Sequence, residues 1–284
     1  MHKHQILIAG CGDVGIALGI QLASQGHQVY GLRRNINQLP QSIQGIAADL
    51  TDSASLQQLP AHIDIVIYCV AAGKRDEQHY RDAYINGLTN LQAALNRSTG
   101  KPKQLFFVSS TAVYNQCQHE WIDETSATEP ATFSGQIMLE AEHCALNNEI
   151  PGCVVRFSGI YGPGRNYMLR QVKDGTGYAE TPLQYSNRIH RDDCVGVLAH
   201  LIDRVENQAL EQVYLASDSA PAPLYDVTHW LAEQLGTTIQ HHSAIRQISS
   251  KRCRNQRILD SGYRFKYPDF KAGYASLLED FKAN

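Results

Sequence analysis

Three glycines at fixed spacing are the residues of this chain whose chemistry can be inferred first. Gly10, Gly12 and Gly15 form the pattern G-x-G-x-x-G in the segment LIAGCGDVGIALG. Gly10 permits a tight turn, Gly12 lets the backbone approach a pyrophosphate, and Gly15 lets a helix pack closely on a strand. The N-terminus of that helix presents free N–H groups to phosphates. The pattern predicts a bound dinucleotide, with Asp13 and Val14 also at the loop; a glycine turn that only packs is the alternative.

The end of the next expected strand indicates which dinucleotide is bound. A carboxylate at this position accepts hydrogen bonds from the ribose diol of NAD, whereas this chain has Arg33 and Arg34. Arginine suits a 2′-phosphate, so we predict NADP rather than NAD; a solvated arginine pair that tolerates either cofactor is the alternative. Asp49 follows the third expected strand and, with Leu50, is assigned to the adenine end, although Asp49 could equally only begin a turn.

These residues need a framework that brings strand ends together. Apolar, strand-like segments alternate with helix-like segments that carry apolar residues at helical spacing. The expected strands are QILIAG, HQVYGLRR, GIAADL, IDIVIYCVAA, KQLFFVSS and GCVVRFSGIYG, and the expected helices are DVGIALGIQLASQG, YRDAYINGLTNLQAALNRS and SGQIMLEAEHCALNN. This alternation predicts an α/β fold, a Rossmann-type doubly wound parallel sheet. We expect the core over residues 1–160 and, over 161–284, a part that is mostly a small substrate lobe with some elements packing back on the core.

Composition narrows the class of protein. The 284 residues are 43% hydrophobic and carry a net charge of −3, so no basic field indicates nucleic acid. No apolar run reaches the roughly 20 residues of a membrane helix, and the first residues lack a signal-peptide layout. Seven cysteines at irregular spacing do not indicate a disulfide framework, so we expect a cytoplasmic protein. The scattered histidines lack partners at ligand spacing, and we expect no metal site.

Several motifs occur in a fixed order along the chain: FFVSSTAVYN, VVRFSGIYGPGR, NRIHRDDCVGVL and GYRFKYPDF. In this order they resemble the extended short-chain dehydrogenases/reductases of the NAD-dependent epimerase/dehydratase family, over nearly the whole length. The glycine loop is one residue shorter than the usual G-x-x-G-x-x-G of that family. The resemblance implies further cofactor contacts from Val70, Ala71 and Ala72, which follow the fourth strand, and from Ser109 and Phe157.

The resemblance also shows what is missing. Members of the family transfer a hydride to or from a nicotinamide while a Tyr moves a proton, and a Lys one helical turn later lowers the pKa of that Tyr. If Gly135 and Glu142 are matched to the pattern Y-G-x-x-K-x-x-x-E, Ser134 stands at the Tyr position and Met138 at the Lys position. The chain is therefore identified as an atypical member that lacks the Tyr-x-x-x-Lys pair, and we expect Ser134 only to cap its helix.

A second alignment of the same helix gives the same answer. Matching Glu140 instead puts Thr132 and Gln136 at the Tyr and Lys positions, so neither alignment supplies the pair. The Asn that the family carries on an earlier helix is replaced by Tyr84, although Asn86 is nearby.

Other residues are candidates for the chemistry. The resemblance makes Ser110 the residue that binds the substrate oxygen, with Ser109 and Thr111 as close alternatives. Tyr114, Tyr161 and His190 are candidate substitutes for the missing Tyr; the alternatives are packing for the two tyrosines and a loop hydrogen bond for the histidine.

We therefore expect an NAD(P)-binding, atypical oxidoreductase or epimerase that acts on a sugar nucleotide or another carbonyl or hydroxyl metabolite. The alternatives are a non-catalytic NADP(H)-binding redox sensor or regulatory module, and a scaffold with a vestigial pocket. Family members grip the substrate diphosphate from the C-terminal lobe, where Arg165 and Arg188 lie; solvation or an ion pair is the alternative for both. The resemblance further implies a homodimer through the helix DEQHYRDAYINGLTNL.

Overall fold

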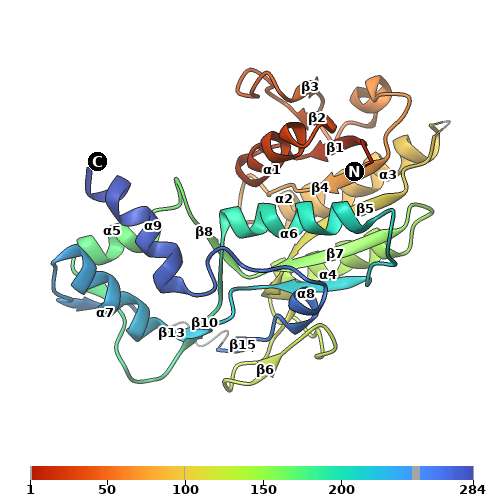
Figure 1. Ribbon diagram of the computed structural model, residues 1–284. Coiled ribbons are helices and arrows are strands. Elements are labelled where there is room, and N and C mark those ends of the chain that lie inside the picture. The colour runs from red at the N-terminus through yellow and green to blue at the C-terminus, as the bar shows by residue number, and fades with distance from the viewer. Residues whose placement is uncertain (1, 99, 245–249, 284) are drawn as a thin grey trace. The chain divides into compact units, whose positions relative to one another are not determined.

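One seven-stranded sheet organises the chain, in the order β12-β7-β5-β4-β1-β2-β3 (Figure 1). The computed structural model describes residues 2–98, 100–244 and 250–283. The strands are β1 (Gln5–Ala9), β2 (Gln28–Arg33), β3 (Gln44–Ala47), β4 (Ile65–Tyr68), β5 (Gln104–Ser110), β7 (Gly152–Phe157) and β12 (Val213–Ala216). All pairings from β3 to β5 are parallel. The predicted Rossmann-type parallel sheet is confirmed.

The order of the strands fixes where a ligand can bind. The chain moves outward from β1 to β3 and then returns to β4 on the other side of β1. In open α/β sheets, ligands bind outside the carboxyl ends of the strands at the point where the order reverses. Here that point lies between β1, which is followed by the glycine loop, and β4, which is followed by Val70, Ala71 and Ala72.

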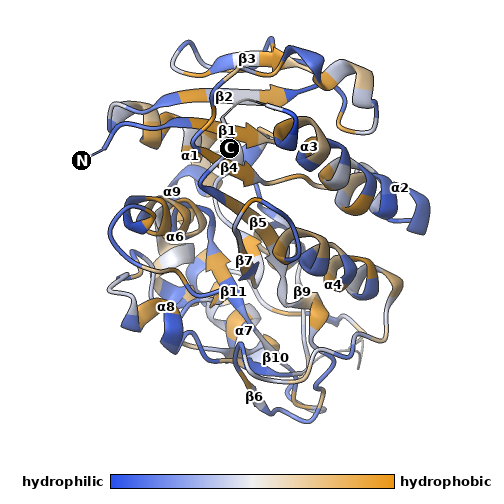
Figure 2. Cartoon of the chain, turned by 90° about the vertical axis from the view of Figure 1, so that its right-hand side faces the viewer, coloured by the Kyte–Doolittle hydropathy of each residue, from blue (hydrophilic) through white to orange (hydrophobic). Residues whose placement is uncertain are grey.

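Helices cover both faces of the sheet, and Figure 2 shows α1 and α6 on one face and α2, α3 and α4 on the other. They span α1 (Asp13–Ser24), α2 (Glu77–Arg81), α3 (Gly87–Asn96), α4 (Phe133–Leu146) and α6 (Arg191–Arg204). All four residues of β4 are buried. A strand covered on both faces is apolar at nearly every position rather than at alternate ones, which is the pattern that the sequence shows there.

The long helix expected over residues 80–98 contains a wider turn. A π-helical segment, Asp82–Asn86, separates α2 from α3. The Tyr68 hydroxyl of β4 donates to the Ala83 carbonyl at 2.5 Å, and a Cβ on Gly87 would lie 2.6 Å from the same hydroxyl. The wide turn thus accommodates a tyrosine that reaches out from the sheet. Such π turns occur frequently at functional sites.

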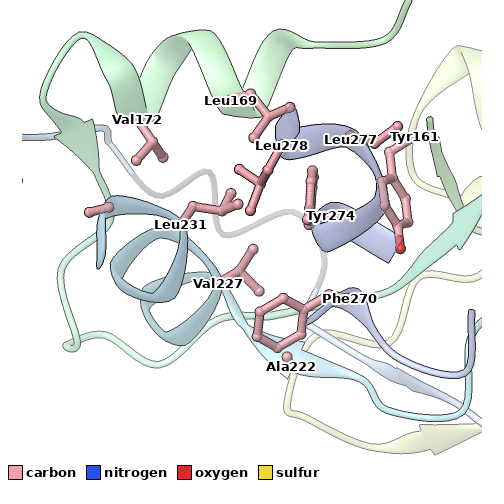
Figure 3. Close-up of a cluster of buried hydrophobic side chains, with 11 residues drawn as sticks. Tyr161, Leu169, Val172, Ala222, Val227, Leu231, Phe270, Tyr274, Leu277 and Leu278 are labelled. Atoms are coloured by element: carbon pink, nitrogen blue, oxygen red, sulfur yellow. The ribbon is translucent and has the colours of Figure 1, made fainter. Parts of the chain in front are cut away.

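Contacts divide the chain into two interleaved units. Unit 1 comprises residues 1–113, 128–156 and 195–214, and unit 2 comprises residues 114–127, 157–194 and 215–284. The division at residue 160 that we expect from the sequence stays a prediction. In unit 2, α5 (Tyr167–Lys173), α7 (Leu224–Leu235) and α9 (Phe270–Ala283) surround a hydrophobic cluster (Figure 3). Gly236 ends α7 in the left-handed conformation, with φ 65°, as the sequence predicts.

The remaining elements of unit 2 are short. They are β6 (Trp121–Ile122), β8 (Gly159–Tyr161), β9 (Thr176–Gly177), β10 (Tyr185–Ser186), β11 (Arg188–His190), β13 (Ala222–Pro223), β14 (His241–His242), β15 (Arg252–Cys253) and α8 (Gln256–Asp260). The 3₁₀ turns Ser53–Gln58 and Thr111–Val113 belong to unit 1. None of the helices formed by the described residues has the length and apolar character that crossing a bilayer requires. All the cysteines are free thiols, and the cytoplasmic location stays a prediction.

Two buried histidines stack at the amino ends of β1 and β2. The rings of His4 and His27 lie 5.5 Å apart and nearly parallel, and the His4 N–H donates to Nδ1 of His27 at 3.1 Å. Burial lowers the pKa of both rings below 6.5; Asp64 and Glu206 oppose this for His4, and Asp203 opposes it for His27. Lys103 and His2 reinforce the lowering for His4, and the His4 ring reinforces it for His27. The pair is therefore stable in its neutral form.

We predict that this pair makes the fold sensitive to acid. A group whose pKa is lower in the folded than in the unfolded state contributes stability that is present above the unfolded pKa and is lost as pH falls through the folded one. The free energy of unfolding, measured by urea denaturation, should therefore fall as pH drops below about 6.5. In His27→Asn, which keeps an acceptor for the His4 N–H, the fall between pH 7 and pH 5 should be shallower. An unchanged slope would show that other groups cause the acid sensitivity.

Candidate cofactor-binding site

The glycine loop after β1 has the geometry of a tight phosphate loop. Gly10 has a φ of 78°, and a Cβ at this position would lie 2.7 Å from the Cys69 carbonyl oxygen and from the Cα of Val70. A Cβ on Gly15 would lie 3.1 Å from the Ile8 side chain. Neither position accommodates a side chain without movement. The loop is thereby held against the end of β4, and α1 is held against β1.

Gly12 differs because the space beside it is open. A Cβ on Gly12 would meet only the Gly10 carbonyl oxygen, at 3.8 Å. Gly12 is the N-cap of α1, and with no side chain it cannot cap the first turn, which Asp13 and the buried Val14 begin. Open space in front of uncapped N–H groups suits the two phosphates of a dinucleotide. These residues therefore fit a pyrophosphate.

The arginine at the end of β2 reaches back to the glycine loop. Nη1 of Arg33 donates to the Cys11 carbonyl at 3.2 Å, and Nη2 donates to Oε1 of Gln38 at 3.2 Å. Arg34 is exposed, and its charge helps to lower the pKa of Asp49. Two cations thus lie at the carboxyl ends of β2 and β3, on the side of β1 where the adenosine half of a dinucleotide binds in this fold.

Asp49 and Leu50 form the turn after β3. The Asp49 carboxylate accepts the Thr51 N–H at 2.9 Å and the Thr51 hydroxyl at 2.7 Å, and these two bonds are the main causes of its lowered pKa. The Leu50 carbonyl accepts the Asn90 side-chain amide at 3.0 Å. Asp49 therefore begins a turn, which is one of its two predicted roles, and its contact with adenine stays a prediction.

The N-cap of α4 is Thr132, and the prediction that Ser134 caps this helix is wrong. The Thr132 hydroxyl accepts the Gly135 N–H at 3.2 Å, and the Ser134 hydroxyl lies 3.1 Å from it, inside the first turn. Both residue types favour N-caps, so sequence alone did not separate them. A cap side chain accepts from the residue two or three positions later, and the helix begins two residues earlier than we expected.

A buried ion pair determines how α4 aligns with the family pattern. Nε and Nη2 of Arg156 donate to Oε1 and Oε2 of Glu142 at 2.9 and 2.6 Å, and the Ser109 hydroxyl donates to Oε1 at 2.5 Å. Glu140, by contrast, is exposed and pairs with Arg81. The buried acid of the helix is therefore Glu142, which favours the alignment with Ser134 and Met138 at the Tyr and Lys positions. Because the hydroxyl of Ser109 serves this pair, its cofactor contact stays a prediction.

Ser110 ends β5 at the carboxyl edge of the sheet. It is partly buried, and its hydroxyl accepts the Ala112 N–H at 3.2 Å. Thr111, the alternative, begins the 3₁₀ turn that follows. Ser110 thus lies at the edge where ligands bind in this fold, and its catalytic role stays a prediction.

The candidate substitutes for the missing Tyr lie in unit 2. The Tyr161 hydroxyl is buried against α9, because a Cβ on Gly273 would lie 1.6 Å from it, and it makes no hydrogen bond to the described residues. Burial raises the pKa of Tyr161 far above its usual range. Figure 3 shows its ring beside Tyr274 and Leu277 in the hydrophobic cluster. This geometry favours the packing role.

His190 is enclosed by aromatic rings. Tyr161 lies 5.3 Å away edge-on, Tyr267 lies 4.1 Å away, and Nδ1 of His190 accepts the Asp192 N–H at 3.2 Å. Burial lowers the pKa of His190 to about 4. A neutral ring that accepts a hydrogen bond from its own loop fits the alternative role of His190, which is a loop hydrogen bond rather than proton transfer.

The backbone of Tyr114 contacts Lys251, a residue that the sequence analysis did not single out. The Tyr114 carbonyl accepts Nζ of Lys251 at 2.9 Å, and both residues are buried. Burial lowers the pKa of Lys251. Lys251 stands in the polar run SSKRCRN, which resembles an exposed surface segment, so no local pattern marks it as buried.

Three further predicted residues have different environments. Arg188 is buried rather than solvated, and its side chain forms a hydrogen bond with the Tyr274 hydroxyl. Burial raises the pKa of Asp218 to about 8, and the charge of Arg188 opposes this rise. Arg165 is exposed. Phe157 is buried at the end of β7. Their contacts with cofactor or substrate stay predictions.

Comparisons with known proteins agree with this geometry. The family model described as "NAD dependent epimerase/dehydratase family" matches residues 6–216. A solved structure from Methylobacillus flagellatus, assigned to the NAD-dependent epimerases/dehydratases, is 38% identical, with a TM-score of 0.84 over 99% of this chain and 100% of that one.

Two more distant structures share the fold. The UDP-glucose 4-epimerase of Thermotoga maritima, solved with UDP-glucose, is 15% identical with a TM-score of 0.83, over 98% of this chain and 99% of that one. The human epimerase family protein SDR39U1, solved with NADPH, is 19% identical with a TM-score of 0.79, over 97% of this chain and 99% of that one.

Proposed function

This chain belongs to the NAD-dependent epimerase/dehydratase family, and from that premise we propose that it binds NADP(H) and acts as an atypical oxidoreductase or epimerase on a carbonyl or hydroxyl metabolite. The observation that carries the proposal is the open, uncapped N-terminus of α1 at Gly12, where the strand order reverses. A bound nicotinamide supplies hydride transfer. The protein supplies the phosphate cradle, the cations at the adenosine end and, through the Ser110 hydroxyl, a hydrogen bond to the substrate oxygen.

The preference for NADP rests on Arg33. Its guanidinium bonds the glycine loop and Gln38, and this placement at the end of β2 supports a contact with a 2′-phosphate. The human relative solved with NADPH shows that this cofactor is bound on the same fold.

We predict that Arg33→Asp reverses the cofactor preference. Removing the cation and adding a carboxylate should raise the Kd of NADPH by about 10- to 100-fold, the loss of a charge-assisted hydrogen bond, while NADH binding improves. Fluorescence titration of both cofactors measures this ratio. Arg34→Asp, one residue further and exposed, is the matched control and should have a smaller effect. Equal affinities of the wild-type protein for both cofactors would refute the role of Arg33.

For the substrate, we propose only a chemical class. A sugar nucleotide is one candidate, because a UDP-glucose 4-epimerase of the same fold binds UDP-glucose. Arg165 is exposed, as a residue that contacts a diphosphate must be, whereas Arg188 is buried beside Tyr274. A homodimer through the helices over residues 76–91 remains part of the proposal.

The absence of a Tyr and a Lys at residues 134 and 138 favours a second candidate function, a redox sensor that binds NADP(H) without turnover. A serine hydroxyl has little acidity near neutral pH without an adjacent base, and methionine carries no charge. Cofactor-loaded protein should be screened against sugar nucleotides and carbonyl compounds while nicotinamide absorbance is followed. Oxidation of NADPH, or conversion of any compound to a new product without net oxidation, as an epimerase would give, supports the enzyme; tight binding with neither result across the panel supports the sensor.

A further inference from the structure

Tyr84 places a phenol beside the loop that follows β4. It lies on the π-helical segment Asp82–Asn86 and is 8% exposed. Its hydroxyl oxygen accepts the Ala72 N–H at 3.4 Å. Among the residues that the structure describes, the hydroxyl donates to no acceptor. Of the two hydrogen-bonding roles of the hydroxyl, only the acceptor role is used within the described part of the chain.

The position of this phenol follows from unit 1 alone. Ala72 closes the short segment that begins with Val70, and Val70 is the residue against which Gly10 packs. The loop that Tyr84 touches thus adjoins the phosphate loop, on the β4 side of β1. Arg33 lies at the end of β2, on the opposite side of β1. If the adenosine half binds toward Arg33, the nicotinamide half extends toward Val70, Ala72 and Tyr84.

The aromatic surroundings hold the Tyr84 ring in this position. The ring centroid of Tyr80 lies 5.3 Å from that of Tyr84, and the ring of Phe133, at the start of α4, lies 5.4 Å from that of Tyr80. Tyr68 bonds the carbonyl of Ala83, the preceding residue. Burial raises the pKa of Tyr84, so the phenol keeps its proton across the physiological range.

We propose that the Tyr84 hydroxyl donates a hydrogen bond to an oxygen atom in the nicotinamide half of the bound dinucleotide, which makes Tyr84 a cofactor-binding residue. This inference rests on the proposed function, since it requires that the glycine loop binds the cofactor. A neutral phenol that accepts a backbone N–H and donates to the ligand satisfies both of its hydrogen-bonding roles. The phenol stays protonated while it donates this hydrogen bond.

The test is Tyr84→Phe, which keeps the ring and removes only the hydroxyl. We expect the Kd of NADPH to rise about 5- to 15-fold, as for the loss of one hydrogen bond. The Kd of adenosine 2′,5′-bisphosphate, which carries only the adenosine half, should stay within about twofold of the wild-type value, because a single hydrogen bond at the other half contributes nothing to it. Tyr80→Phe is the matched control, because Tyr80 lies one turn before Tyr84 and its ring packs against the Tyr84 ring. This variant should bind both ligands as the wild type does.

Two results would overturn the inference. If Tyr84→Phe binds NADPH with the wild-type Kd, the hydroxyl does not reach the cofactor. If the variant loses the bisphosphate fragment as much as NADPH, Tyr84 supports the fold of the site and does not contact the nicotinamide half. Failure of the proposed function is a different result, in which the wild-type protein itself binds neither NADPH nor the fragment, and the inference falls with it.

Discussion

Gly12→Val should abolish dinucleotide binding and leave the fold intact. The new side chain would extend into the open space before the N-terminus of α1, where only the Gly10 carbonyl oxygen lies within 4 Å, at 3.8 Å. Valine would occupy the volume that the pyrophosphate needs and keep it from the first-turn N–H groups. We expect the Kd of NADPH to rise by about 100-fold or more, equivalent to about 3 kcal/mol. Calorimetric titration measures the Kd, and circular dichroism measures the melting temperature.

A second glycine provides the control for Gly12→Val. Gly73 is exposed, and a Cβ added to it would have no neighbouring atom within 4 Å, so Gly73→Val should be tolerated by the fold and should leave the phosphate cradle open. Weak binding in Gly73→Val as well would indicate a general effect of valine in these loops. Wild-type affinity in Gly12→Val would show that the phosphates do not bind at this helix.

The second large effect concerns stability. Glu142→Ala should lower the free energy of unfolding by about 3–5 kcal/mol, because it leaves the Arg156 guanidinium buried without the carboxylate that neutralises it. Glu142 and Arg156 are 1% and 5% exposed, and the carboxylate also accepts from Ser109. Urea denaturation of the two proteins at pH 7 measures the difference.

Glu140 offers a matched comparison two residues earlier on the same helix. It pairs with Arg81 at 3.1 Å, but both side chains are more than 40% exposed. Glu140→Ala should therefore leave the free energy of unfolding nearly unchanged, as for surface ion pairs in general. Equal losses for Glu140→Ala and Glu142→Ala would contradict the assignment of Glu142 to a buried, stabilising pair.

The sheet and the glycine loop were predictable because their signals are local. A run such as IDIVIYCVAA shows in itself that both faces of a strand are covered, and the loop glycines stand between a strand and a helix. The α4 helix was also predictable, but its N-cap was not. Thr132 and Ser134 are both good caps, and the choice depends on which hydroxyl reaches a free N–H.

Features that depend on contacts between distant residues were not predictable. The π turn at residues 82–86 depends on Tyr68, which stands on β4 and reaches the Ala83 carbonyl. The Glu142–Arg156 pair joins a helix to the following strand, and it was needed to choose between two alignments of α4. Lys251 and Arg188 are charged residues whose burial follows from tertiary packing rather than from local pattern.

The central claim is that this chain binds NADP(H) through the glycine loop although α4 lacks the Tyr and the Lys of the family pattern. Isothermal titration of the wild-type protein with NADPH tests it most directly. We predict one binding site per chain, with a Kd for NADPH of about 100 μM or lower and a higher Kd for NADH. No heat of binding with either cofactor up to about 1 mM, in a sample whose fold is confirmed by circular dichroism, would contradict the claim.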